Sequence, residues 1–293
     1  MAAVAQGGLI TFNCGAAPVT IGMTSTAKVF NDKPDVTIDG GGKVTLDGGG
    51  STRILYQNTC DSTQVFLTSA CQNQERPRLS VQNIGFANGN AAGITAENDV
   101  GGGGGAIFVR GGQFKIVNAR FTNNRCGPTG PDLGGGAVRA ISLFNNLPVF
   151  VSGSTFGGAA ALGNSCSNGG ALSGLFTSYT VLNSVFTHND AIGSGANPAQ
   201  ANTPGGGSGG AIYNDGVAFT LNIAGSIFRD NTANEGGGAV FFVGNGNTGT
   251  LTLTNSSFAR NLSRKFETDG FPGFFIIAAP GQPTNNGSTF SAN

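Results

Sequence analysis

The stretch Leu251-Thr-Leu-Thr-Asn-Ser-Ser-Phe-Ala-Arg-Asn261 shows the pattern that decides the fold of this chain. Its first half alternates apolar and polar residues, which predicts a β-strand, and a phenylalanine then precedes an asparagine by three positions. Related stretches recur along the chain, and their phenylalanines are separated by 35, 35, 30, 42, 30 and 32 residues. Self-similarity with a period of tens of residues predicts stacked supersecondary units in place of a pocketed globule. The phenylalanines are Phe86, Phe121, Phe156, Phe186, Phe228, Phe258 and, with a weaker match around it, Phe290.

A second repeated element, Gly-Gly-Ala followed by an aliphatic residue, stands between these stretches. Its five copies begin at Gly104, Gly135, Gly169, Gly209 and Gly237. The glycine pair permits a positive φ at a corner and a close approach of neighbouring backbones. No unit contains a helix that could cover its apolar side. We therefore expect the units to stack, with each strand paired to its equivalent one coil away, at about 4.8 Å.

Stacking places equivalent side chains above one another. We expect the phenylalanines to stack inside, and the asparagines three residues after them to form an amide ladder that satisfies backbone groups at a corner. An ordinary role as turn residues is the alternative for these asparagines. The copy that ends at Phe156 has no asparagine at this offset. The predicted molecule is a rod with flat sides and no deep hollow. The ladder asparagines are Asn124, Asn189, Asn231 and Asn261.

The chain before the first full repeat has a different pattern. Short strands that end in Asp-Gly turns are predicted at Val36–Asp39 and Val44–Asp47. We expect residues 1–34 to form an N-terminal cap and first coil, and residues 35–293 to form one continuous domain. No segment has a convincing helical pattern. The predicted fold class is all-β: a single-stranded right-handed parallel β-helix, or β-solenoid, of roughly eight to ten coils.

Composition narrows the classes of function. Lys+Arg and Asp+Glu both number 15, so the net charge is zero and gives no electrostatic case for nucleic acid. Gly is abundant at 51 residues, but 39 % hydrophobic residues and 22 Phe argue against disorder. No apolar run approaches the roughly 18 residues of a spanning helix, so we expect no membrane insertion. The first residues lack the basic and long apolar regions of a signal peptide.

Five cysteines bear on the compartment. Cys60 and Cys71 bracket an 11-residue step, which predicts a disulfide-pinned loop. Cys126 and Cys166 each lie between a phenylalanine stretch and a Gly-Gly-Ala box in consecutive repeats, so stacking brings them close enough for a second bridge. Cys14 is left over. Two bridges indicate an extracellular or cell-surface location, whereas five buried thiols in a cytosolic protein are the alternative.

The Phe-x-x-Asn and Gly-Gly-Ala-aliphatic boxes resemble the repeats of the chlamydial polymorphic outer-membrane proteins. More broadly, the chain resembles bacterial right-handed parallel β-helix proteins of the pectin-lyase-like superfamily, over roughly residues 35 to 290. The resemblance implies a secreted or surface-exposed location, adhesion or contact with carbohydrate or another cell-surface ligand, and often no enzyme activity.

Candidate chemical groups are few, because only 10 % of residues are charged where about 25 % is typical. Asp99, Asp132 and Glu235 precede Gly-Gly-Ala boxes, so one edge of the stack could carry them and bind Ca²⁺ through oxygen ligands. Arg139 and Asp215 follow such boxes and, with Glu235, are the catalytic candidates if the protein is an enzyme. Solvated corner residues are the alternative interpretation. The boxes that mark polygalacturonases and pectate lyases are absent from the sequence.

Two functional hypotheses follow. The first is a non-catalytic extracellular scaffold, a surface or adhesion module that self-associates end to end through the open strand edges of a solenoid. The second is a carbohydrate-active enzyme, either a polysaccharide lyase or a glycoside hydrolase, that acts on the long face. No cofactor is expected apart from Ca²⁺. Residues 193–207 form the longest insertion, and we expect them to protrude.

Overall fold

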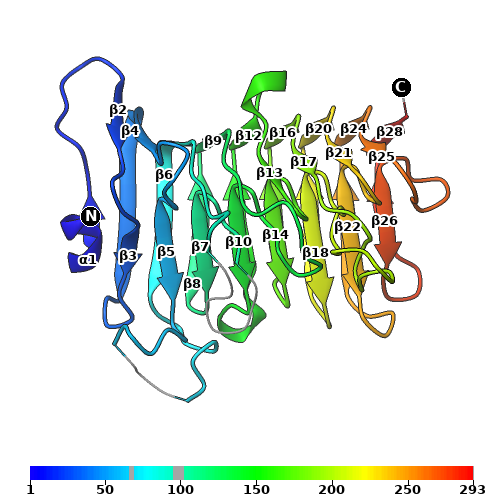
Figure 1. The fold of residues 1–293 in the computed structure, drawn as a ribbon, viewed down its shortest axis with the longest axis horizontal. Helices are drawn as coiled ribbons and strands as arrows, with labels where there is room; N and C mark the ends of the chain where they lie inside the picture. Colours follow the sequence, from blue (N-terminus) through cyan, green and yellow to red (C-terminus); the bar gives the residue numbers. More distant parts are fainter. Residues whose placement is uncertain (66–68, 95–101, 293) are drawn as a thin grey trace.

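The computed structural model describes residues 1–65, 69–94 and 102–292 of the chain. Short parallel strands stack along one long axis, from helix α1 (Ala2–Gln6) at one end to β26 (Phe274–Ile277) and β28 (Thr289–Ser291) at the other (Figure 1). The strands belong to three parallel sheets that line the long sides of the stack. This all-β architecture of stacked parallel strands is consistent with the predicted β-solenoid.

The largest sheet divides into two branches beside its longest strands, β4 (Asp35–Asp47) and β6 (Arg78–Ala87). The N-terminal strands β1 (Gly8–Ile10) and β2 (Val19–Gly22) both pair with β4. One branch contains β8 (Gln113–Val117), β11 (Val149–Ser152), β15 (Tyr179–Leu182), β19 (Thr220–Ala224), β23 (Thr250–Thr254) and β27 (Thr284–Asn286). The other branch contains β9 (Arg120–Thr122), β12 (Thr155–Gly157), β16 (Val185–Thr187), β20 (Ile227–Arg229), β24 (Ser257–Ala259) and β28.

The second and third sheets complete the outline of the stack. The second sheet, in order of pairing, contains β3 (Ala27–Val29), β5 (Leu55–Asn58), β7 (Ile107–Arg110), β10 (Val138–Ile141), β14 (Leu172–Leu175), β18 (Ile212–Gly216), β22 (Val240–Gly244) and β26. We call it the groove sheet, because its outer face carries the groove described below. The third sheet contains β13 (Ser165–Cys166), β17 (Asp190–Ala191), β21 (Thr232–Ala233) and β25 (Leu262–Ser263).

The stretch that opened the sequence analysis forms β23 and β24, with a bend between them. Leu251 and Leu253 are buried, whereas the threonines beside them are partly exposed, as the alternation predicts. Asn255 then adopts a positive φ of 45°, which turns the chain between the two strands. Phe258 on β24 points into the core. One repeat therefore supplies two sides of a coil.

The phenylalanine stack is confirmed. Seven rings, from Phe86 to Phe290, follow one another in the core with centroid separations between 4.4 and 5.3 Å. All of these contacts are between stacked rings, and strand pairing places each ring in register with the next, as between Phe156 and Phe186. The column contributes most of the large side chains in the main hydrophobic core.

The asparagine ladder is also present and has one more rung than the sequence indicated. The Nδ2 atoms of Asn124, Asn164, Asn189 and Asn231 each donate to the Oδ1 atom of the next rung, at 2.8 to 2.9 Å, and Asn261 accepts the last bond. Asn164 fills the rung that the Phe156 copy lacks at the usual offset. An insertion with a single turn of 3-10 helix, η2 (Ala160–Leu162), displaces it in sequence but leaves it in line.

The Gly-Gly-Ala corners have the geometry that the glycines predict. Gly209 has a φ of 73°, which a residue with a side chain rarely adopts. At Gly210, a Cβ atom would overlap the carbonyl oxygen of Gly238 on the next coil. The two glycines therefore do different things: the first allows the turn, and the second lets adjacent coils approach to strand-pairing distance.

Both predicted disulfides are present. Cys60 and Cys71 have Cα atoms 4.9 Å apart, and Cys126 and Cys166 have Cα atoms 4.8 Å apart. Cys14 is an exposed thiol outside both bridges. Disulfides persist in oxidising environments, so this pattern indicates an extracellular setting.

No segment of the sequence has a convincing helical pattern, yet the N-terminal end of the stack carries α1, whose Val4 is buried in the main core. A second single turn of 3-10 helix, η1 (Phe144–Asn146), lies between β10 and β11. None of the helices in the described part of the chain has the length and apolar character to cross a membrane.

Candidate ligand-binding groove

The outer face of the groove sheet is unusually apolar. Side chains alternate along each strand, so Ile212 and Val240 point into the core whereas Tyr213 and Phe241 point outward. Phe275 on β26 continues this outer column, and the Tyr213–Phe241 and Phe241–Phe275 rings stack at 5.0 and 5.2 Å. Tyr213 and Phe241 are themselves buried, so Phe275 is the one of these three rings that is partly exposed.

Two insertion loops cover part of this face and contact each other. The loop of residues 127–133 and the loop of residues 193–207 are joined by a hydrogen bond from the Gly130 amide to the Gly205 carbonyl, at 3.1 Å. The longer loop pairs with itself through antiparallel bridges such as Ser194 to Gly205. The prediction that residues 193–207 protrude is therefore wrong: the loop folds back against the shorter insertion and brings Asn197 over the sheet.

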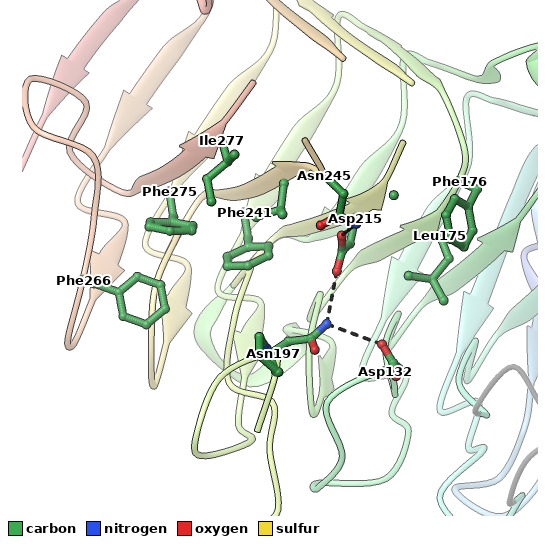
Figure 2. A pocket seen from close by; sticks show the side chains of 13 residues that line it. Asp132, Leu175, Phe176, Asn197, Asp215, Phe241, Asn245, Phe266, Phe275 and Ile277 are labelled. Atoms are coloured by element: carbon green, nitrogen blue, oxygen red, sulfur yellow. Dashed lines mark hydrogen bonds between the residues drawn. The ribbon is translucent and has the colours of Figure 1, made fainter. Parts of the chain in front are cut away.

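Between these loops and the last strands lies a groove of about 790 Å³. Its floor includes Phe241, Val243, Phe275 and Ile277 from β22 and β26. Figure 2 shows Phe266 beyond Phe275 at one end, and Leu175 and Phe176 at the other. The sides of the rod are therefore not all flat, because insertions of unequal length leave an open recess between them on this face.

A cluster of polar groups forms one wall of the groove. Asp215 Oδ2 accepts hydrogen bonds from the Tyr213 hydroxyl at 3.0 Å and from Asn197 Nδ2 at 3.1 Å. Asn245 Nδ2 donates to the other Asp215 oxygen at 3.2 Å. The same Asn197 nitrogen lies 3.4 Å from Asp132 Oδ1, so one amide bridges two carboxylates that come from different coils (Figure 2).

The environment of this cluster favours the protonated forms of Asp215 and Tyr213. The pKa of Asp215 is raised above its ordinary value, chiefly because burial penalises the carboxylate and further because the Asp132 charge lies nearby. The hydrogen bond from Tyr213 acts in the opposite direction without reversing the shift. Burial also raises the pKa of Tyr213 well above 10.0, so this phenol remains a hydrogen-bond donor.

Arg139, a catalytic candidate from the sequence, lies behind the groove wall. Its side chain is fully buried, donates from Nη1 to Ser173 Oγ at 2.6 Å and from Nη2 to the Asp132 carbonyl at 2.5 Å. Burial lowers the pKa of this guanidinium, and the nearby Tyr213 and Asp132 oppose the shift. Arg139 therefore holds the 127–133 loop in place, and a ligand in the groove would not touch it.

Glu235 is also separate from the polar wall. Its buried Oε1 accepts from the Gly195 amide and from Lys265 Nζ, both at 2.7 Å, so it ties the 193–207 loop to the following coil. The three catalytic candidates thus do not form one site: only Asp215 lines the groove.

The predicted Ca²⁺ edge does not form a cluster in the described residues. Asp132 lies at the groove and Glu235 is buried under the long insertion, while Asp99 lies outside the described residues. Within the described ranges, no three His, Cys, Asp or Glu side chains are placed to hold a metal ion together.

The raised pKa of Asp215 predicts a pH-dependent effect on stability. Because the folded protein holds this proton more tightly than the unfolded chain, stability falls as the pH rises from the ordinary pKa of 3.8 through the raised value. The Asp215→Asn variant cannot ionise here, so its stability relative to the native protein should increase as the pH rises from about 4 through the raised pKa. Urea unfolding at a series of pH values measures this difference.

Asp39 provides a control, because its pKa is shifted in the opposite direction to that of Asp215. Hydrogen bonds from Gln82, the Gly41 amide and Asn83 lower its pKa, so its carboxylate stabilises the fold above the unfolded pKa. The Asp39→Asn variant should therefore lose stability relative to the native protein as the pH rises from the lowered pKa of Asp39 to the ordinary value of 3.8, and the difference should change little at higher pH. Curves of the same sign for both variants would contradict the assigned environments.

Several residues of the groove were not identified from sequence. The signal for Tyr213 and Phe241 was available, because both occupy the fifth position of a Gly-Gly-Ala box, where strand alternation points side chains outward. Asn197 had no such signal, since it lies inside an insertion without repeat register.

Comparison of the chain with protein-family models, with curated proteins and with solved structures found no match. The groove and the stacked architecture are therefore the basis for inferring what the protein does.

Proposed function

We propose that this protein is a non-catalytic extracellular scaffold, a right-handed parallel β-helix of the pectin-lyase-like type, that binds carbohydrate in the groove. The right-handed assignment rests on a general rule: connections between parallel strands of one sheet are right-handed in about 98 % of cases. Two disulfides support the extracellular location. The resemblance of the repeat boxes to surface proteins agrees with an adhesive role.

The observation that carries the proposal is the combination of groups in the groove. Asp132, Asn197, Asp215 and Asn245 converge on one wall and can accept or donate hydrogen bonds to hydroxyl groups. The floor also offers the apolar side chains of Val243, Phe275 and Ile277, against which the C–H groups of sugars can pack. Binding sites for small ligands typically combine a mostly apolar lining with a few convergent polar groups.

The placement of the charged candidates favours binding over catalysis. Arg139 and Glu235 are fully buried and committed to holding loops. Asp215 is held by three neutral side-chain donors that fix it in place. The scaffold therefore has rigid walls around a recess, which suits recognition of a ligand that is not chemically changed.

One observation favours glycoside hydrolysis as a second candidate. Since Asn197 Nδ2 lies 3.4 Å from Asp132 Oδ1 and 3.1 Å from Asp215 Oδ2, these two oxygens are separated by no more than about 6.5 Å. Carboxylate pairs at about this separation act in glycosidases, where one member has a raised pKa and serves as the acid. Asp215, whose pKa is raised by burial, would be that acid and Asp132 the base or nucleophile.

Carbohydrate binding can be tested with a glycan array and immobilised polysaccharides. Phe176 is 51 % exposed at the groove, so Phe176→Ala should leave the fold intact and weaken retention about fivefold or more. Phe150→Ala is the matched control, because Phe150 is a partly exposed ring on the largest sheet. Absence of glycan retention by the native protein, or equal weakening by both variants, would overturn the proposal.

The same glycans separate binding from hydrolysis. Reducing ends released from a retained polysaccharide should stay at the level of the buffer blank, with and without Ca²⁺. Turnover that Asp215→Asn or Asp132→Asn abolishes would replace the scaffold with the glycosidase.

A further inference from the structure

The charges that face the groove are all of one sign. Among the described residues that line it, the ionisable ones are Asp132 and Asp215, and no lysine or arginine is among them. Arg139 points its guanidinium at Ser173 Oγ and the Asp132 carbonyl, behind the wall. Lys265 is not among the lining residues, and its Nζ pairs with Glu235 Oε1 at 2.7 Å. Once the pH exceeds the raised pKa of Asp215, the recess therefore presents two carboxylates to a ligand, with the Arg139 charge held behind them.

This sign discriminates among polysaccharides. Carboxylates of a uronic acid chain would meet Asp132 and Asp215 with like charge, which costs binding energy at a partly desolvated site. Neutral sugars would find hydrogen-bond partners but no charge complement. An ammonium group would donate to these carboxylates in charge-assisted hydrogen bonds, which are about twice as strong as neutral ones.

The dimensions of the recess favour a linear ligand that runs along the long axis. The outer rings of β18, β22 and β26 repeat at 5.0 and 5.2 Å. An extended polypeptide advances by about 3.3 Å per residue and loses register with such a repeat. A pyranose unit in a linear chain is about as long as this repeat, so successive sugars advance by about one strand each along the recess.

A second hollow extends the recess. It measures about 380 Å³, is lined by Gln72, Ile141 and Ser142, and shares Leu175 and Phe176 with the groove. The two together follow the outer face of the groove sheet over at least β10 to β26, so a chain of several sugars has continuous contact.

We propose that the groove selects a linear glycan that carries amino groups, such as an oligomer of glucosamine, with Asp132 and Asp215 pairing with its ammonium groups while the exposed apolar side chains of Phe176, Phe275 and Ile277 contact its sugar rings. This inference rests on the proposed carbohydrate-binding function and adds the substrate class. It assigns specificity to the two carboxylates and general affinity to the apolar floor.

Isothermal titration with three oligomers of equal length tests the inference: glucosamine, N-acetylglucosamine and galacturonic acid, at a series of pH values that includes one where the amines are protonated and Asp215 is ionised. The glucosamine oligomer should bind at least about tenfold more tightly than the acetylated one, since charge-assisted pairs exceed neutral ones by this order. Added salt should weaken binding of the glucosamine oligomer most, because partly exposed charge pairs are screened. The galacturonic acid oligomer should bind weakest.

The carboxylates are then removed as a pair. In the Asp132→Asn, Asp215→Asn double variant, the preference for glucosamine over N-acetylglucosamine should fall below about twofold while binding of the acetylated oligomer persists. Asp32→Asn, an exposed acid at the N-terminal end that pairs with Lys33, is the matched control and should retain the preference.

Each outcome decides a different claim. Equal binding of the glucosamine and N-acetylglucosamine oligomers would overturn the inference and leave carbohydrate binding in place. Tightest binding of galacturonic acid, or a preference that survives in the double variant, would overturn it as well. A lysine-containing peptide that binds as tightly as the glucosamine oligomer would overturn the choice of a glycan, and with it the proposed function.

Discussion

The Phe186→Ala variant is expected to lose about 3–5 kcal/mol of unfolding free energy, the range for truncation of a fully buried phenylalanine. Phe186 is fully buried and stacks on Phe156 at 4.6 Å and on Phe228 at 4.4 Å. Truncation leaves a cavity in the middle of a column whose neighbours are fixed by strand pairing and cannot collapse into it. Equilibrium denaturation followed by circular dichroism measures the loss.

Phe150→Ala is the control for this experiment. Phe150 lies on the outer face of the neighbouring coil, where it is half-buried and contacts Lys115 through its ring. Its truncation should cost less than about 1 kcal/mol, because little apolar area leaves the core. Similar losses for the two variants would show that the stacked column does not carry the stability assigned to it.

The Gly210→Ala variant is expected to be destabilised by about 3 kcal/mol or more, the upper range for overpacking. A Cβ atom at this position would overlap the Gly238 carbonyl on one side and the Thr232 carbonyl on another. Both obstacles are backbone atoms, so relief requires adjacent coils to separate and strand pairing to weaken. Thermal unfolding of the purified variant measures the effect. We also expect a low yield of soluble protein.

Gly22→Ala separates this steric effect from the general response to a glycine substitution. Gly22 ends β2, is exposed, and has no atom within 4 Å of an added Cβ. Its substitution should change stability by no more than about 0.5 kcal/mol in either direction. If Gly210→Ala were equally mild, close approach at the corner would not be the reason for the second glycine.

The architecture could be predicted from sequence because residues at the same position of successive repeats are also neighbours in the folded stack. Phe121 and Phe186 stack where their spacing placed them, and the Gly-Gly pairs make the corners that their chemistry allows. Asn164 was missed since an insertion moved it along the chain without moving it in space. A fixed offset from phenylalanine is therefore a weaker guide than the ladder contact itself.

The groove was harder to predict, because insertions build it. Asp132 and Asn197 belong to different loops and meet only where these fold over the groove sheet. Asp215 was selected for its position after a Gly-Gly-Ala box, and this position does face the groove. Glu235 was selected by the same reasoning on the other side of a box, where the side chain lies beneath a loop. The position of a residue in the repeat thus predicts whether its side chain points outward from the sheet. It does not predict whether an insertion covers that side chain.

The columns of rings and of asparagine amides contain no group that gains or loses a proton in the ordinary range of pH. Acidification can thus alter the carboxylates of the recess while the rungs that hold successive coils together keep their bonding unchanged. The proton-dependent behaviour of the recess and the packing between coils therefore reside in different side chains, so substitution of the carboxylates leaves the rungs themselves in place.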